Sequence, residues 1–82
     1  MKLNVKKNTF GFFISLDNYV RDKKIAEYLD LSLEEYQAIL IKHNTILYAK
    51  TFYPECFFKN EKDAQKALKV LEPYEILAKL TE

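Results

Sequence analysis

Apolar and polar residues alternate along residues 10–16, FGFFISL. Successive side chains of an extended chain point to opposite faces, so every second residue shares a face. The apolar side chains that share one face here are Phe10, Phe12, Ile14 and Leu16. The segment therefore predicts a strand with one buried face. Phe13 lies on its opposite face and needs separate cover.

Helical spacing replaces this alternation after residue 21. An apolar stripe of Ile25, Ala26 and Leu29 predicts a short helix, and Asp22 is a candidate N-cap for it. A second helix is predicted over residues 33–43. Its shared apolar face consists of Leu33, Tyr36, Leu40 and His43.

The start of the second helix carries the strongest local signal in the chain. Ser32 and Glu35 match the capping box, in which each side chain accepts a hydrogen bond from the other residue's backbone amide. Leu31 and Tyr36 have the spacing of a hydrophobic staple. Together these residues predict where the helix begins and how the chain enters it.

The second half of the chain predicts a hairpin and a helix. Residues 45–53, TILYAKTFY, read as a strand, and residues 56–58 read as a second strand after a turn. Asn60 is the expected cap of the last clear helix. The core stripe expected for this helix is Ala64, Ala67, Leu68, Val70 and Leu71. Pro73 is expected to interrupt it, and residues 74–80 read as a short helix or a closing strand.

The predicted order is β-α-α-β-β-α followed by a short last element. This order indicates an α+β fold, with a small antiparallel sheet, a helix-turn-helix-like pair and a C-terminal helix. If residues 74–80 form a strand, the order becomes the ferredoxin-like βαββαβ. A length of 82 residues suits one modest core, so we expect a single domain over residues 1–82.

The amino-acid composition and charge of the chain limit the classes of function that it can have. Thirteen basic and twelve acidic residues give a net charge of +1, without the basic excess typical of a dedicated nucleic-acid-binding protein. The single cysteine, Cys56, cannot form an internal disulfide, which indicates a reducing, cytoplasmic setting. We expect neither a membrane span nor a signal peptide.

The sequence offers little catalytic chemistry. His43 and Cys56 are the only imidazole and the only thiol, and nothing in their spacing places them together as a nucleophile and its base. They are also too few for a metal site, which usually takes three or four ligands. One glycine cannot build a phosphate-binding loop. We therefore expect no catalytic residues, no metal and no cofactor.

Residues 23–43, which include IAEYLDLSLEEYQAIL, resemble the helix-turn-helix motif. The departure is Asp30, where the motif usually has a glycine in the left-handed conformation. The hairpin at 45–58 then corresponds to the wing of a winged-helix domain. The resemblance implies a DNA-binding regulator that uses the helix at 33–43. The basic residues it would place against DNA are Lys6, Lys7, Lys42 and Lys50.

The outward face of that helix favours a protein partner instead, because Glu34 would meet a polyanion there. Six Phe and six Tyr are also more than one small core needs, so we expect an exposed aromatic patch that extends to Phe13. The residues expected to bind a partner are Glu34, Ala38, Lys42, Tyr48, Lys50 and Phe52.

Two further resemblances bear on function. ECFFKNEKDAQKALKVL resembles the third strand and second helix of RNA-recognition-motif domains, but Phe57 and Phe58 lack the glycines of the stacking motif, so we expect them in the core. In size and composition the chain resembles small phage and prophage proteins of Gram-positive bacteria. This implies a small non-enzymatic regulator or inhibitor that contacts a protein, such as a host protein. A homodimer is the other protein contact we consider.

Overall fold

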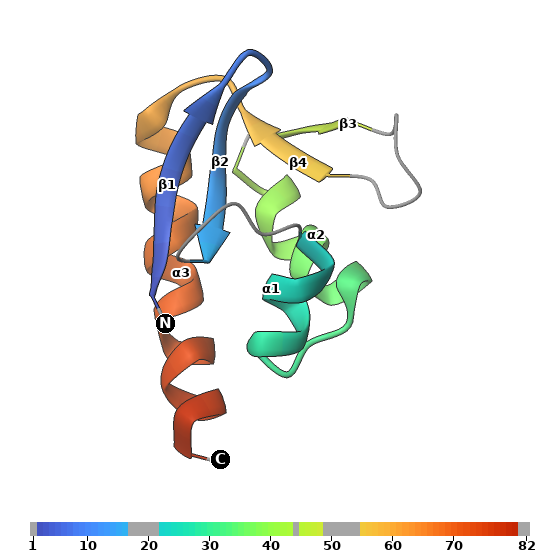
Figure 1. Ribbon diagram of the computed structural model, residues 1–82, viewed down its shortest axis with the longest axis vertical. Helices are drawn as coiled ribbons and strands as arrows, with labels where there is room; N and C mark the ends of the chain where they lie inside the picture. The colour runs from blue at the N-terminus through green and yellow to red at the C-terminus, as the bar shows by residue number, and fades with distance from the viewer. Residues whose placement is uncertain (1, 17–21, 44, 49–54, 81–82) are drawn as a thin grey trace.

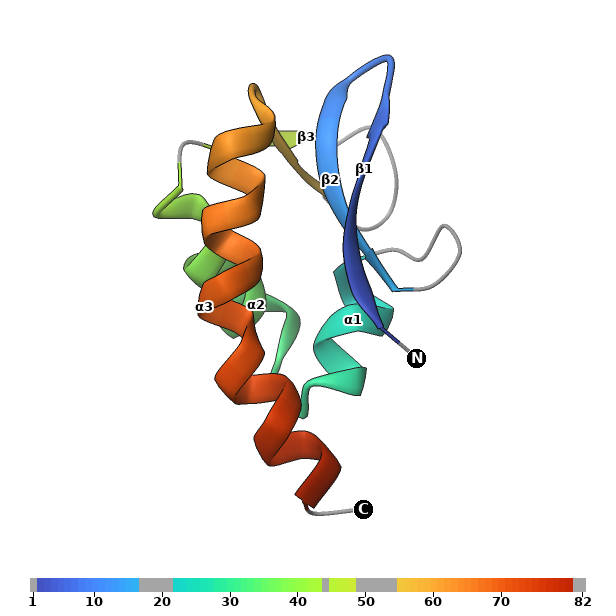
Figure 2. The same cartoon turned by 90° about the vertical axis from the view of Figure 1, so that its left-hand side faces the viewer.

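The computed structural model describes residues 2–16, 22–43, 45–48 and 55–80. Over these residues the chain is α+β, with elements in the order β-β-α-α-β-β-α. An antiparallel sheet forms one layer, and the three helices of the described residues pack against one of its faces (Figures 1 and 2). The predicted fold class is therefore confirmed, with one strand more than expected.

The sheet contains four strands within the described residues: β1 (Leu3–Asn8), β2 (Gly11–Leu16), β3 (Thr45–Tyr48) and β4 (Glu55–Phe58). Their spatial order is β1-β2-β4-β3, and each pair of neighbours is antiparallel. Strands β3 and β4 pair as the predicted hairpin requires. In this part of the chain β1 and β3 are consequently the two edges of the sheet (Figure 1).

Strand β1 was not predicted from the sequence. Only Leu3 and Val5 supply apolar residues in alternation, and the strand ends with two lysines and an asparagine. Lysine is common on edge strands because its charge discourages pairing with another sheet. An edge strand of this kind therefore carries too weak an apolar pattern to be recognised, although its full register with β2 is formed.

Gly11 sets the geometry of the β1–β2 turn. Its φ is 135°, and a Cβ atom here would lie 2.7 Å from the carbonyl oxygen of Phe58, so only glycine fits without a shift. The backbone amide of Phe10 donates to Oδ1 of Asn8 at 2.9 Å in the same turn. Because Phe10 lies in this turn, it does not continue the alternation of β2. The expectation that Phe10 shares the buried face is wrong, since its side chain is exposed.

The helices are α1 (Asp22–Tyr28), α2 (Leu33–Ile41) and α3 (Glu61–Leu80). They enclose one core with the helix-facing side of the sheet. Its buried members are Leu3, Ile14, Leu16, Ile25, Ala26, Leu29, Tyr36, Leu40, Cys56, Phe58, Ala64, Ala67 and Leu71. The apolar stripe predicted for the first helix is confirmed, as are the two central positions of the stripe predicted for the second.

The corner between α1 and α2 is fixed by backbone hydrogen bonds. Asp30 has a left-handed φ of 58°. The amide of Leu31 donates to the carbonyl of Ala26 at 2.9 Å, and the amide of Asp30 donates to that of Glu27 at 3.1 Å. This pair of bonds is a Schellman motif, which ends α1. Asp30 thus adopts the conformation for which the helix-turn-helix motif usually has glycine.

The predicted capping box then starts α2. The Ser32 hydroxyl accepts from the Glu35 amide at 3.0 Å, and the Glu35 carboxylate accepts from the Ser32 amide at 3.1 Å. Leu31 is partly buried against the core that contains Tyr36, as the staple requires. Hydrogen bonds therefore cap both the end of α1 and the start of α2 at the corner that joins the two helices.

Helix α3 is continuous through Pro73. It begins as predicted, with the Asn60 side chain accepting from the Asp63 amide at 2.9 Å. Residues 74–80 belong to the same helix, so the ferredoxin-like alternative and the separate last element are both wrong. Proline inside a helix costs about 3 kcal/mol. The cost is offset because Leu71 and Ala78, on either side of Pro73, are buried.

Candidate interaction surfaces

The outward face of α2 carries three of the predicted partner-binding residues. Glu34, Ala38 and Lys42 are all exposed, and their spacing of four residues places them in one stripe. Ile41 lies beside this stripe and is 54% exposed. The surface is therefore a mixed one, with one acid, one methyl group, one base and one large aliphatic side chain.

The first turn of α2 is acidic. Glu34 and Glu35 are both exposed. Two hydrogen bonds with Ser32, chiefly the one from its backbone amide, lower the pKa of Glu35, so this carboxylate stays ionised at neutral pH. A recognition helix usually presents its N-terminal residues to DNA bases. The N-terminal end of α2, by contrast, presents the negative charges of Glu34 and Glu35.

The lysines that would contact DNA are not brought together. Lys6 and Lys7 lie in β1 at one edge of the sheet, whereas Lys42 is the C-cap of α2, shortly before β3 at the opposite edge. The ammonium of Lys7 lies 5.3 Å from the centre of the Phe12 ring. The expected basic arm is therefore a strand of the sheet. Lys50 lies outside the described residues.

Of the residues expected in the exposed aromatic patch, only Phe13 has a described side chain, and the expectation that it is exposed is wrong. Phe13 is 7% exposed and Phe57 is 6% exposed, and their rings meet edge to face with centres 6.0 Å apart. They come from neighbouring strands on the sheet face opposite the helices, so each covers part of the other. The side chains of Tyr48, Lys50 and Phe52 lie outside the described residues.

A buried carboxylate joins α1, α2 and β4. Oδ2 of Asp22 accepts from the backbone amide of Cys56 at 2.9 Å and from the side-chain amide of Gln37 at 3.2 Å. Burial raises the pKa of Asp22 to about 6, although these two hydrogen bonds oppose the rise. The sequence suggested Asp22 as an N-cap; its carboxylate instead connects α1 to α2 and to β4.

The groups beside Asp22 are poor reactants. Burial, with the nearby Asp22 charge, raises the pKa of the Cys56 thiol to about 12. A thiol with so high a pKa supplies little thiolate, the reactive form. The Tyr36 hydroxyl is buried without a hydrogen-bond partner among the described residues, and burial raises its pKa well above the usual range. Among the described residues, no three His, Cys, Asp or Glu side chains are grouped so as to hold a metal ion.

The sequence did not predict the surface on the second half of α3. Ile76, Leu77 and Leu80 are 60%, 61% and 76% exposed, and Val70, expected in the core, is 41% exposed. Beside them is a groove of about 170 Å³, lined by Leu29, Asp30, Leu31, Tyr74, Leu77 and Ala78. The signal was present in the sequence as a run of apolar residues around Pro73, but the assumed break at Pro73 hid its helical period.

Comparisons of the chain with protein-family models, with curated proteins and with solved structures found no match. Within the residues that the structure covers, no helix has both the length and the apolar character needed to cross a membrane. The function therefore has to be argued from the surfaces themselves.

Proposed function

We propose that this chain is a small non-enzymatic binding protein, a regulator or inhibitor of the kind found in phages and prophages, that acts through protein contact. The outward face of α2 makes that contact through Glu34, Ala38, Ile41 and Lys42. The observation that carries the proposal is the exposure of Ile41 within this charged stripe, because a large exposed aliphatic group flanked by polar ones is typical of protein interfaces.

The way in which α2 is held against the core supports this role. The capping box fixes the start of the helix, and the Schellman motif fixes the chain that enters it. Tyr36 and Leu40 hold its inner side in the core. A face held on a rigid element loses little conformational entropy when it binds, which favours affinity.

The charges of this face support a protein partner over a phosphate backbone. Glu34 and Lys42 have opposite signs and lie two helical turns apart on the same stripe. Such a pattern is complementary to a protein surface with the reverse order of charges. The pair offers no net attraction to a polyanion.

The test is affinity capture by the full chain from a lysate of the organism that encodes it. Ala38→Glu and Ile41→Glu alter the proposed face, and Gln65→Glu is the matched control at an exposed position of α3. Circular dichroism establishes that each variant is folded. We expect one protein to be captured by the wild type and by Gln65→Glu but lost with both α2 variants. Capture that is equal for all four chains would rule out this face.

The second candidate function is a winged-helix-like DNA-binding regulator. It is favoured by one observation, the left-handed Asp30 between two short helices that are followed by the β3–β4 hairpin. In this function, α2 enters the major groove and Lys42 contacts phosphate. The separation of Lys6 and Lys7 from Lys42 across the sheet weighs against it.

Binding to random duplex DNA at two salt concentrations distinguishes the two candidates. Salt-sensitive binding that is lost in Lys42→Glu and kept in Lys59→Glu, an exposed control, would favour the DNA-binding function. We expect no measurable binding at low salt. That outcome would leave protein contact as the function of α2.

A further inference from the structure

A groove lies between the α1–α2 corner and the second half of α3, two segments that are neighbours in both views of the ribbon (Figures 1 and 2). Its volume is about 170 Å³. A cavity of roughly 150 Å³ holds a benzene molecule, so this groove has room for one side chain of a partner. Its apolar walls consist of Leu29, Leu31, Tyr74, Leu77 and Ala78, and the sixth lining residue is Asp30.

Asp30 brings a negative charge to these apolar walls. Its side chain is exposed and forms neither a hydrogen bond nor an ion pair with another residue that the structure describes. Its backbone has a left-handed φ of 58°, a conformation for which glycine is the usual residue at the end of a helix. The corner therefore does not need the carboxylate, which is available to a ligand.

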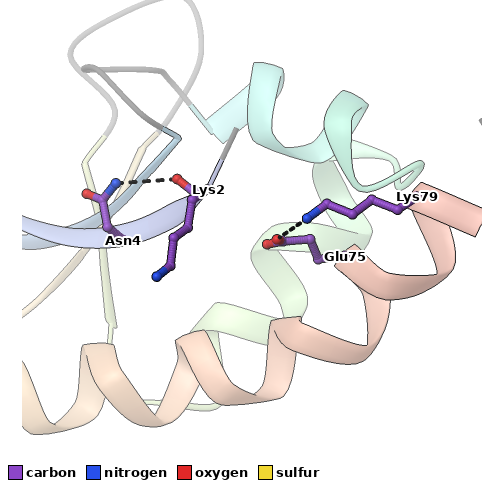
Figure 3. A network of polar contacts seen from close by, with 4 residues as sticks. All are labelled: Lys2, Asn4, Glu75 and Lys79. Carbon is purple, nitrogen blue, oxygen red and sulfur yellow. Dashed lines mark hydrogen bonds and ion pairs between the residues drawn. The ribbon is translucent and has the colours of Figure 1, made fainter.

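Nearby lysines are paired with other carboxylates. Lys79 follows the groove residue Ala78, and its ammonium donates to Glu75 of the same helix at 3.2 Å (Figure 3). On α1, the ammonium of Lys24 lies 3.5 Å from the carboxylate of Glu27. Neither pair neutralises Asp30, so the groove is complementary to a cation that also carries apolar surface.

Arginine is the side chain that best matches this combination. Its aliphatic stem packs on apolar surface while its charged head stays with a carboxylate. The planar guanidinium presents paired N–H donors to a carboxylate and stacks on aromatic rings. The groove supplies both kinds of contact, in Asp30 and Tyr74. Lysine has a compact ammonium without a planar face, and an acidic side chain would be repelled by Asp30.

We propose that this groove binds one arginine side chain of a partner protein, with the stem against Leu31 and Leu77 and the guanidinium donating to Asp30. The inference rests on the proposed function in taking the partner to be a protein. It adds a second contact, separate from the outward face of α2. A single side chain binds only in about the millimolar range, so the groove adds selectivity for the partner and does not hold it alone.

An NMR titration of the full chain with three small probes tests the groove. The probes are the N-acetyl methylamides of arginine, lysine and norleucine, of which norleucine keeps an unbranched stem without the charge. We expect the amide signals of residues 29–31 and 77–78 to shift most with the arginine probe, less with lysine and least with norleucine. An arginine probe that does not bind, or a lysine or norleucine probe that binds as tightly, would overturn the proposal.

Two variants at Asp30 test the role of its carboxylate. Asp30→Asn removes the charge and keeps a residue that tolerates the left-handed conformation, whereas Asp30→Gly suits that conformation better than the wild type does. Glu61→Gln is the matched control, because it removes an exposed carboxylate roughly 20 Å before Tyr74 along α3. We expect both Asp30 variants to raise the dissociation constant of the arginine probe by at least about tenfold, and the control to leave it unchanged. Binding that persists in both Asp30 variants would contradict the proposal.

The failure of this proposal and that of the proposed function are distinguishable. The titration needs no partner protein, whereas capture depends on Ala38 and Ile41 on the outward face of α2. A chain that binds no probe but captures a protein through that face would refute the groove alone. A chain that binds the arginine probe through Asp30, but whose capture does not respond to the α2 variants, would refute the α2 contact and support the groove.

Discussion

The two halves of α3 have the same helical period but different surroundings. In the first half, Ala64, Ala67 and Leu71 are fully buried against the sheet, and the outward side carries Lys62, Lys66 and Lys69. In the second half, the inward side is still partly covered, while the outward side carries Ile76, Leu77 and Leu80. Only the second half is apolar on both sides.

This difference lies in the kind of side chain that each half exposes to water. Lysines on an outward face need no partner because water solvates them. Aliphatic side chains on an outward face have no such compensation, and a patch of them commonly marks a contact surface. The first half therefore holds the domain together, while the second half leaves aliphatic side chains exposed to solvent.

The largest expected effect comes from substituting one leucine in each half. Leu71→Ala removes a fully buried side chain and is expected to lower the free energy of unfolding by about 2–5 kcal/mol. Leu80→Ala alters an exposed side chain and is expected to change the free energy of unfolding by less than about 0.5 kcal/mol. Urea unfolding measures both changes. Equal losses would contradict the contrast between the halves.

The packed region also contains a group that opposes folding at neutral pH. The folded-state pKa of Asp22 is about 6, above its ordinary value of 3.8, so folding favours the protonated form. The stabilisation that the protonated Asp22 carboxyl provides is therefore complete below about pH 4. It is lost as the pH rises through about 6, and the total loss in the free energy of unfolding is about 3 kcal/mol. Asp22→Asn is expected to remove this loss.

The difference in unfolding free energy between wild type and Asp22→Asn, measured from pH 4 to pH 7, isolates the contribution of Asp22 from that of the other carboxyl groups. Glu35, whose pKa is lowered, is present in both proteins, so its contribution cancels in the difference. A difference that does not change with pH would show that the Asp22 carboxyl is less buried than described.

Pro73 marks the junction of the two halves. Pro73→Ala restores a backbone N–H to the helix interior at an exposed position, and is expected to raise the free energy of unfolding by about 2 kcal/mol. Thermal unfolding followed by circular dichroism measures the change. Should Pro73→Ala destabilise the protein, the helix would not be continuous through this position.

The smallest expected effect concerns the α1–α2 corner, which lines the groove beside Leu77. Ser32→Ala removes the side-chain acceptor for the Glu35 amide and is expected to lower the free energy of unfolding by about 1 kcal/mol. Ser32→Gly should lower it by only a few tenths of that amount. Denaturant unfolding of the two variants checks the order. If alanine proves no worse than glycine at this position, the cap contributes nothing to stability.

Local features were predictable from the sequence wherever neighbouring residues determine them. The capping box at Ser32 and Glu35 and the Asn60 cap are confirmed because each involves residues within three positions of each other. The inward stripe of α1 follows in the same way from its helical period. For these elements, the sequence alone was sufficient.

Features that depend on distant partners were not predictable. Asp22 bonds to Gln37 and Cys56, and no local pattern reveals that α1, α2 and β4 meet at one point. Phe13 was expected to be exposed, but Phe57 from a neighbouring strand covers part of it, and its side chain is buried. The outward face of α3 was missed because Pro73 was assumed to end the helix, whereas tertiary packing overcomes its local cost.

The central claim is that the domain holds the two halves of α3 unequally, because the inward side chains of the first half are fully buried and the second half is largely exposed. Amide hydrogen exchange of the full chain tests it most directly. We predict that the amides of residues 64–71 are protected more strongly than those of residues 74–80. Equal protection in the two halves would contradict the claim.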